Sequence, residues 1–222
     1  TAEYGLAANA MANIKRPSRR SPEPKGIDLA DLRKLFAATA DDPSGSRDRA
    51  ILAFMIDTGC RAEGVIGLEL SKFDPDQRRA TVTEKGRKTR QVFLTDLTIS
   101  LLQAWGSVRP ENAQTVFCSL SNLTYGKPLS YEGLIHILGQ LKLRAGVKGR
   151  VNPHSFRHAF ARQYIMNGGD LSTLSRLMGH SDSAVTSHYY AVFTGEELAH
   201  LHDRFSPLKG VLDEPDEDAK NP

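Results

Sequence analysis

A histidine and two adjacent tyrosines stand close together near the end of the sequence. His180 precedes Tyr189 by nine residues, and Tyr190 follows directly. A tyrosine hydroxyl can act as a nucleophile and form a covalent intermediate. However, Val185, Tyr189 and Val192 also have the spacing of an inward helical stripe, which is typical of core packing. The tyrosine pair taken alone leaves both interpretations open.

Four short segments contain cationic side chains that could act together with a reactive tyrosine. The segments TGCRAEG, EKGRKTR, PHSFRH and LMGHSD contribute Arg61, Lys85, His154, Arg157 and His180. Each of these residues alone has an ordinary explanation as a solvated charge or a helix-end donor. Together, two arginines can bind the nonbridging oxygens of a phosphodiester, and histidines can donate hydrogen bonds or move protons. A lysine on a hairpin can protonate a leaving oxygen while the tyrosine attacks phosphorus.

The sequence offers no carboxylate cluster that would bind a metal ion, so we expect neither a metal nor another cofactor. The cations of the protein would then stabilise the charge that a metal ion stabilises elsewhere. His154 and His158 do have the i, i+4 spacing of zinc hydrolases. That alternative is disfavoured because such a pair needs a glutamate between its members, whereas here Arg157 lies there.

The composition is that of a folded protein with an uneven charge distribution. Hydrophobic residues make up 40% and charged residues 25% of the chain, and the net charge is +3. The last twelve residues contain five acids and one lysine, so the rest of the chain carries a net charge of +7. Basic residues gather at 15–25, 78–90 and 142–157. Such clusters favour a polyanionic partner such as nucleic acid.

The lack of a recognisable targeting signal and the spacing of the cysteines lead us to expect a cytoplasmic protein. The longest apolar run, Ala50 to Ile56, is too short to cross a bilayer, and no signal peptide is recognised. Cys60 and Cys118 are far apart and have neither a metal-type nor a redox-type spacing. We therefore expect a reduced compartment and no association with a membrane.

Helical patterns dominate the elements that must position these residues. Leucines at 29, 32 and 35 follow Asp28, which predicts a capped helix, and Ser46 is predicted to cap a second helix that ends at Gly59. The segments 79–84 and 90–94 have strand-like patterns and would form a hairpin with Lys85 and Gly86 at its tip. Further predicted elements are a short helix at 62–70, helices at 96–105, 131–145, 155–167, 171–178, 183–191 and 195–204, and a short strand near Val116. The predicted fold class is α+β, mainly helical, with a small antiparallel sheet.

The ordered motifs, together with HYY at 188–190, resemble the catalytic domain of the tyrosine recombinases. This family includes phage integrases, chromosome-dimer resolvases and transposon integrases. The resemblance runs from about Asp28 to Tyr190 and rests on five motifs in the family's order. It implies the catalytic fold of that family and six catalytic residues, Arg61, Lys85, His154, Arg157, His180 and Tyr189.

The resemblance also implies a role for each of these residues. The two arginines form the phosphate clamp, the lysine is the general acid towards the 5′ oxygen, and Tyr189 is the nucleophile nine residues after the second histidine. One departure concerns an acid that the family usually keeps three residues after the first arginine. Here that position is Gly64, and Glu63 precedes it. We treat Glu63 as structural.

The implied activity is site-specific recombination of duplex DNA through a 3′-phosphotyrosyl intermediate, without ATP or metal. Two strand exchanges through a four-way junction would require a homotetramer, in which a C-terminal helix is exchanged between protomers, and accessory DNA-bending proteins would fit the same scheme. The implied setting is the nucleoid of a prokaryotic cell, or a phage or other mobile genetic element. Candidate DNA-binding residues are Lys15, Arg16, Arg19, Arg20, Arg87, Lys88, Arg90, Lys148 and Arg150.

The predicted organisation has three parts. Residues 1–26 resemble the end of an N-terminal DNA-binding domain and a basic linker, residues 27–205 form the catalytic domain, and residues 206–222 form an acidic, disordered tail.

Two other functions use similar residues. A type IB topoisomerase would relax DNA as a monomer, and a DNA-binding module would lack activity. The helix predicted after the nucleophile favours recombination over relaxation, and every reactive position is occupied, which argues against an inactive module.

Overall fold

The computed structural model describes residues 26–179 and residue 202. Several predictions lie outside the described residues: the basic linker with Lys15, Arg16, Arg19 and Arg20, the helix at 183–191 with Tyr189, most of the helix at 195–204, the acidic tail, and His180. In the described part, no helix is long and apolar enough to span a membrane.

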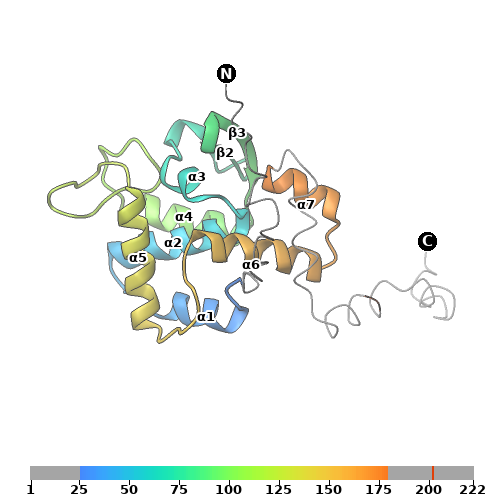
Figure 1. Cartoon of the computed structure of the whole chain (residues 1–222). Helices are drawn as coiled ribbons and strands as arrows, with labels where there is room; N and C mark the ends of the chain where they lie inside the picture. The colour runs from blue at the N-terminus through green and yellow to red at the C-terminus, as the bar shows by residue number, and fades with distance from the viewer. Residues whose placement is uncertain (1–25, 180–201, 203–222) are drawn as a thin grey trace, which may run out of the picture.

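A small antiparallel sheet lies at one edge of a mainly helical body, beside α3, as Figure 1 shows. The elements in chain order are α1 (Leu29–Ala37), α2 (Pro43–Thr58), α3 (Ala62–Ile66), η1 (Leu70–Lys72), β1 (Phe73–Asp74), β2 (Arg79–Glu84), η2 (Lys85–Arg87), β3 (Lys88–Phe93), α4 (Asp96–Gly106), α5 (Tyr131–Arg144), α6 (Pro153–Met166) and α7 (Leu171–Met178). The three strands pair antiparallel in the order β1-β2-β3. This arrangement confirms the predicted fold class, a mainly helical α+β fold with a small antiparallel sheet.

Helix α2 is the central helix and packs against α4 and α6. Its residues from Ala50 to Met55 are buried, so it has no broad solvent face. The prediction that Ser46 caps this helix is wrong, because the helix begins three residues earlier. Asp42 accepts a hydrogen bond from the Gly45 N–H at 2.8 Å, and Pro43 supplies a helical φ at the first position. The predicted end at Gly59 is confirmed.

The remaining elements differ from prediction mainly at their ends. The predicted helix at 62–70 ends at Ile66, and Leu70–Lys72 forms a separate 3₁₀ turn. The strand predicted near Val116 is replaced by isolated bridges at Thr115 and Cys118. The short strand β1 was not predicted, since two residues give no alternation to recognise. The hairpin tip at Lys85 and Gly86 is confirmed as the turn η2.

The main core lies between the helices and the sheet and is built from large apolar side chains. The ring of Phe54 packs edge-on against Phe117, with ring centroids 5.6 Å apart. Trp105 is fully buried, and its indole N–H donates to the Val116 carbonyl at 2.8 Å, so its polar group is satisfied. A smaller apolar cluster joins α6 to α7 through Ala161, Ile165, Leu174 and Met178. The two helices that lead to the candidate site are thereby fixed to each other.

Candidate active site

The turn after α2 brings Arg61 to the candidate site. Gly59 ends the helix with φ +57°, and its N–H donates to the Met55 carbonyl at 3.1 Å. A Cβ at Gly59 would lie 2.5 Å from the Phe160 ring, so glycine is required both for conformation and for space. Two residues later Arg61 occupies the N-cap position of α3, with its side chain one-third exposed.

Arg157 lies on α6 and is almost fully buried. Asn152 caps this helix in a capping box with Ser155, and Pro153 starts it, two residues before the predicted start at 155. The Arg157 guanidinium donates to the Gly59 carbonyl at 2.7 Å and to the Met178 carbonyl at 2.8 Å. The side chain therefore joins the end of α2 to the end of α7.

A pocket of about 430 Å³ collects the predicted phosphate-binding residues. It is lined by Arg61, Ala62, Glu63, Tyr131, Pro153, His154 and Arg157. These residues come from α3, the start of α5 and the start of α6, which are far apart in the sequence. Two guanidinium groups and an exposed imidazole at one pocket can bind an anion and stabilise growing negative charge on it. Three of the six predicted catalytic residues thus share one pocket.

Of the remaining three predicted catalytic residues, only Lys85 lies in the described part of the chain. Lys85 begins the turn η2 that joins β2 to β3, in which Gly86 has φ +78°. His180 and Tyr189 lie outside the described residues. Gly179, which precedes His180 in the chain, ends α7 with φ +65°.

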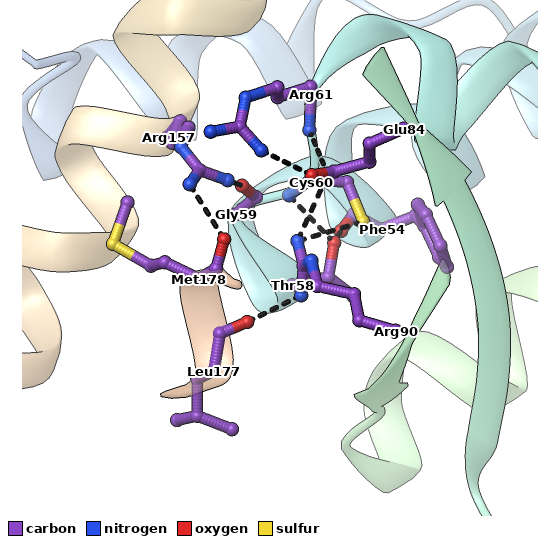
Figure 2. A network of polar contacts seen from close by, with 10 residues as sticks. All are labelled: Phe54, Thr58, Gly59, Cys60, Arg61, Glu84, Arg90, Arg157, Leu177 and Met178. Atoms are coloured by element: carbon purple, nitrogen blue, oxygen red, sulfur yellow. Dashed lines mark hydrogen bonds and ion pairs between the residues drawn. The ribbon is translucent and has the colours of Figure 1, made fainter. Parts of the chain in front are cut away.

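The end of α7 is held by two arginines (Figure 2). Arg90 donates to the Leu177 carbonyl at 2.5 Å, and Arg157 donates to the Met178 carbonyl. The last carbonyl groups of a helix lack intrahelical partners and carry partial negative charge, so cations bind well there. The chain segment immediately before His180 is therefore fixed from both β3 and α6.

Arg90 differs from its predicted role as a DNA-binding residue. Its side chain is only 12% exposed, and its guanidinium donates to Leu177, to Glu84 at 3.2 Å and to the Cys60 sulfur at 3.6 Å. The prediction rested on its place in a basic cluster. On β3 it follows the inward alternation of Val92, so we assign it a structural role instead.

Four other predicted DNA-binding residues lie at the surface. Arg87 and Lys88 are exposed at the hairpin, and Lys148 and Arg150 are exposed in the segment between α5 and α6. Arg87 has φ +56° within its turn. Exposure makes these four side chains available to a partner.

Glu84 belongs to the site and was missed by sequence reasoning. Its carboxylate is bonded to Arg61 and Arg90 (Figure 2). Burial alone raises the pKa of Glu84, but the Arg61 backbone N–H and the Arg90 and Arg61 charges outweigh it, so the pKa lies below its usual value. The signal was available: Glu84 shares the inward phase of β2 with Ala80 and Val82, and a buried carboxylate requires a cation.

Cys60 lies beside these charges without acting as a thiolate. Burial raises the pKa of its thiol to about 11, although the nearby Arg90 charge opposes this. The thiol is therefore neutral near pH 7. Among residues 26–179 and 202, no group of three histidine, cysteine or acidic side chains is arranged to hold a metal ion.

Known proteins match the chain over most of its length. A model of the phage integrase family matches residues 25–196. Tyrosine recombinase XerC of Psychromonas ingrahamii is 27% identical over 206 residues, which cover 91% of this chain and 67% of that protein. The chain thus spans about two thirds of the length of this relative.

Two solved structures share the fold. The crystal structure of XerA recombinase has a TM-score of 0.72 at 23% identity, covering 88% of this chain and 68% of that one. XerH site-specific recombinase, bound to a palindromic difH substrate in a post-cleavage complex, has a TM-score of 0.69 at 20% identity, covering 93% of this chain and 60% of that one. The family match spans α1 to α7 and the whole pocket, so the chain belongs to the phage integrase family of tyrosine recombinases.

Proposed function

We propose that this chain is the catalytic part of a site-specific DNA recombinase that cleaves and rejoins duplex DNA. The observation that carries the proposal is the shared pocket of Arg61, His154 and Arg157. Two fixed guanidinium groups and an imidazole suit one phosphodiester, whose nonbridging oxygens gain charge during substitution at phosphorus. The relatives XerC and XerH are named as recombinases, and XerH is bound to its DNA substrate.

The proposed reaction is a pair of transesterifications. The Tyr189 hydroxyl gives its proton to solvent and attacks phosphorus, the bond to the 5′ oxygen breaks, and that oxygen takes a proton from Lys85. The products are a 3′-phosphotyrosyl link and a free 5′-hydroxyl. A 5′-hydroxyl from the partner strand then attacks the link and passes its proton to Lys85, and the released Tyr189 regains a proton from solvent. One phosphoester bond forms for each that breaks, so the scheme requires no ATP.

The described residues have distinct parts in this scheme. Arg61 and Arg157 bind the nonbridging oxygens, and His154 donates a hydrogen bond to the same phosphate. Lys85 reaches the leaving oxygen from the hairpin turn, next to Arg87 and Lys88. His180 is proposed as a second imidazole donor. The site uses the protein's own cations throughout.

Duplex DNA is the proposed partner, and the exposed basic residues would contact its phosphates. Arg87 and Lys88 lie on the hairpin, and Lys148 and Arg150 precede α6. The basic residues at 15, 16, 19 and 20 would extend this surface. Phosphate contacts fix the position of a protein on DNA, whereas base contacts specify the sequence.

We further propose a homotetramer on two DNA sites, with a helix at 195–204 exchanged between protomers and accessory DNA-bending proteins assisting assembly. The domain limits proposed are 1–26, 27–205 and 206–222.

The named relatives are bacterial recombinases, so we place the reaction with the nucleoid in the cytoplasm, on chromosomal or mobile DNA. Topoisomerase-like relaxation is not favoured, because the matching relatives are recombinases.

The decisive experiment traps the covalent intermediate. Duplexes are first selected from a random pool by binding to the protein, and a selected sequence is then nicked beside candidate scissile positions. Cleavage next to a nick releases a short 5′ strand, so the protein stays attached to DNA. We expect Tyr189→Phe to abolish the adduct and Tyr190→Phe, the matched control, to retain it. An adduct that survives the first change but not the second would assign the nucleophile to Tyr190.

A further inference from the structure

The carboxylate of Glu84 is buried beside the phosphate pocket. Its side chain is 4% exposed and lies on the inward face of β2, in phase with Ala80 and Val82. Those two neighbours are apolar and pack into the core. A charged group in such a place is retained only if hydrogen bonds and opposite charges compensate its loss of water. The identity of its partners therefore indicates what it does.

Both oxygens of Glu84 bind Arg61. Oε1 accepts from the Arg61 backbone N–H at 2.8 Å, and Oε2 accepts from the Arg61 guanidinium at 2.5 Å. One carboxylate thus fixes both the main chain and the charged end of the same residue. Because Arg61 is one-third exposed at the pocket, its guanidinium would otherwise sample many rotamers in solvent. Glu84 restricts it to one orientation before any ligand arrives.

Glu84 also reaches the end of α7 through Arg90. Oε1 accepts from Arg90 at 3.2 Å, and Arg90 in turn donates to the Leu177 carbonyl. Figure 2 shows this continuous chain from Arg61 through Glu84 and Arg90 to Leu177. Among the residues that the structure describes, Glu84 supplies the only carboxylate in this chain of contacts, so Arg61 and Arg90 depend on it for charge balance.

The space that Glu84 fills lies over Gly64. A Cβ at Gly64 would be 3.3 Å from Glu84 Cγ and 3.4 Å from Glu84 Oε1. Gly64 is the position, three residues after Arg61, at which the sequence was expected to carry an acid. The neighbouring Glu63 is exposed, and in the described part of the chain no hydrogen bond or ion pair joins it to Arg61. A carboxylate from β2 therefore occupies the place beside Arg61 that a side chain from α3 would reach.

We propose that Glu84 is a positioning residue for Arg61, which supplies from the strand of the hairpin the acid that α3 lacks. Because Glu84 directly precedes Lys85, the same residue ties the phosphate-binding arginine to the hairpin that carries the general acid. This inference rests on the proposed function of the pocket. It predicts that the charge of Glu84, and not only its volume, is needed for Arg61 to stabilise the reacting phosphate.

The first test compares Glu84→Gln with the wild type on the nicked suicide substrate. The variant should bind DNA within about twofold of the wild type but form the adduct at least tenfold more slowly, the order expected when a charge-assisted hydrogen bond is lost. The difference in the rate of adduct formation between Glu84→Gln and the wild type should be smaller on a substrate whose scissile phosphate carries a methyl group in place of one nonbridging oxygen. That neutral group needs less positive charge from Arg61.

Asp48→Asn is the matched control. Asp48 is also a buried carboxylate between two arginines, Arg47 and Arg144, but it lies near the opposite end of α2 from Arg61. Its replacement should lower stability by a similar route, so any loss of adduct should be equal on the charged and the methylated substrates. An equal loss on both substrates for Glu84→Gln would show a merely structural role and overturn the inference.

A second pair of variants applies if Glu84→Gln does not fold. Glu84→Ala leaves room beside Gly64, and the double variant Glu84→Ala with Gly64→Glu returns a carboxylate to that space from α3. We expect the double variant to form adduct at least tenfold faster than Glu84→Ala alone. No gain from the second change would overturn the inference. A wild-type protein that forms no adduct would instead refute the proposed function.

Discussion

Replacement of Gly59 by alanine is expected to weaken both the fold and the pocket. Gly59 has φ +57°, and an added Cβ would lie 2.5 Å from Phe160 Cδ1 and 2.9 Å from Cγ. The ring belongs to α6, which also carries Arg157, so it cannot move without disturbing that helix. The Gly59 carbonyl is itself the acceptor of an Arg157 hydrogen bond. A shift in the turn would therefore move a pocket arginine.

The size of the effect follows from two separate contributions. The left-handed conformation costs an alanine about 1–2 kcal/mol, and forcing extra volume against a packed ring costs about 1–3 kcal/mol. We expect Gly59→Ala to lower the free energy of unfolding by about 2–5 kcal/mol. For a protein of this size the melting temperature would fall by roughly 4–20 °C.

Gly146→Ala provides the matched control. Gly146 follows α5 with φ +64°, but nothing lies within 4 Å of an added Cβ. It should show only the conformational cost of about 1–2 kcal/mol. Any gain from a stiffer unfolded chain is common to both variants and cancels in their difference. The difference between the two variants thus isolates the contact with Phe160.

The assay is urea unfolding followed by the fluorescence of Trp105, which is the single tryptophan of the chain and is fully buried. Adduct formation on the suicide substrate is measured in parallel. We expect Gly59→Ala to reduce both stability and adduct, and Gly146→Ala to reduce stability alone. If Gly59→Ala proves as stable as Gly146→Ala, the close approach of Phe160 does not constrain the turn, and the reasoning fails.

Two further outcomes are expected. Arg157→Lys should lower the free energy of unfolding by about 1–3 kcal/mol in urea, since one ammonium cannot replace the guanidinium fork between Gly59 and Met178; unchanged stability would contradict this. The folded pKa of Glu84 is depressed, so its charge stabilises the fold above the unfolded pKa of about 4.3 and this stabilisation is lost as pH falls through the folded pKa. The stability difference between wild type and Glu84→Gln should therefore shrink below about pH 4, whereas a difference that is constant with pH would refute the depressed pKa.

Local signals were sufficient for most helices and for the hairpin. Asp28 accepts from the Asp31 N–H at 2.7 Å and caps α1 as predicted, because a cap needs only its own helix turn. The start of α2 was harder, since Asp42 and Ser46 are both good capping residues. Pro43 was the better guide, because it fits the first position of a helix and fits poorly in its interior.

The partners of buried charged side chains were harder to predict from the sequence. Arg90 was assigned to DNA because it lies in a basic cluster, yet its inward phase with Val92 on β3 buries it. Glu84 was passed over for a different reason, since its partner Arg61 lies 23 residues away in the chain. Alternation shows that such a side chain points inward, but it does not show which charge it will meet there.

The family, the order of the motifs and the side chains available for phosphoryl chemistry could all be read from the amino-acid sequence. These properties depend on residue types and spacings along the chain. The packing of the helices and strands was needed to show that Arg61, His154 and Arg157 share a pocket and that Arg90 is a buried link between Glu84 and the end of α7. Pairing between distant charges depends on how strands and helices pack, because a buried charge takes whichever partner the fold brings within hydrogen-bond reach.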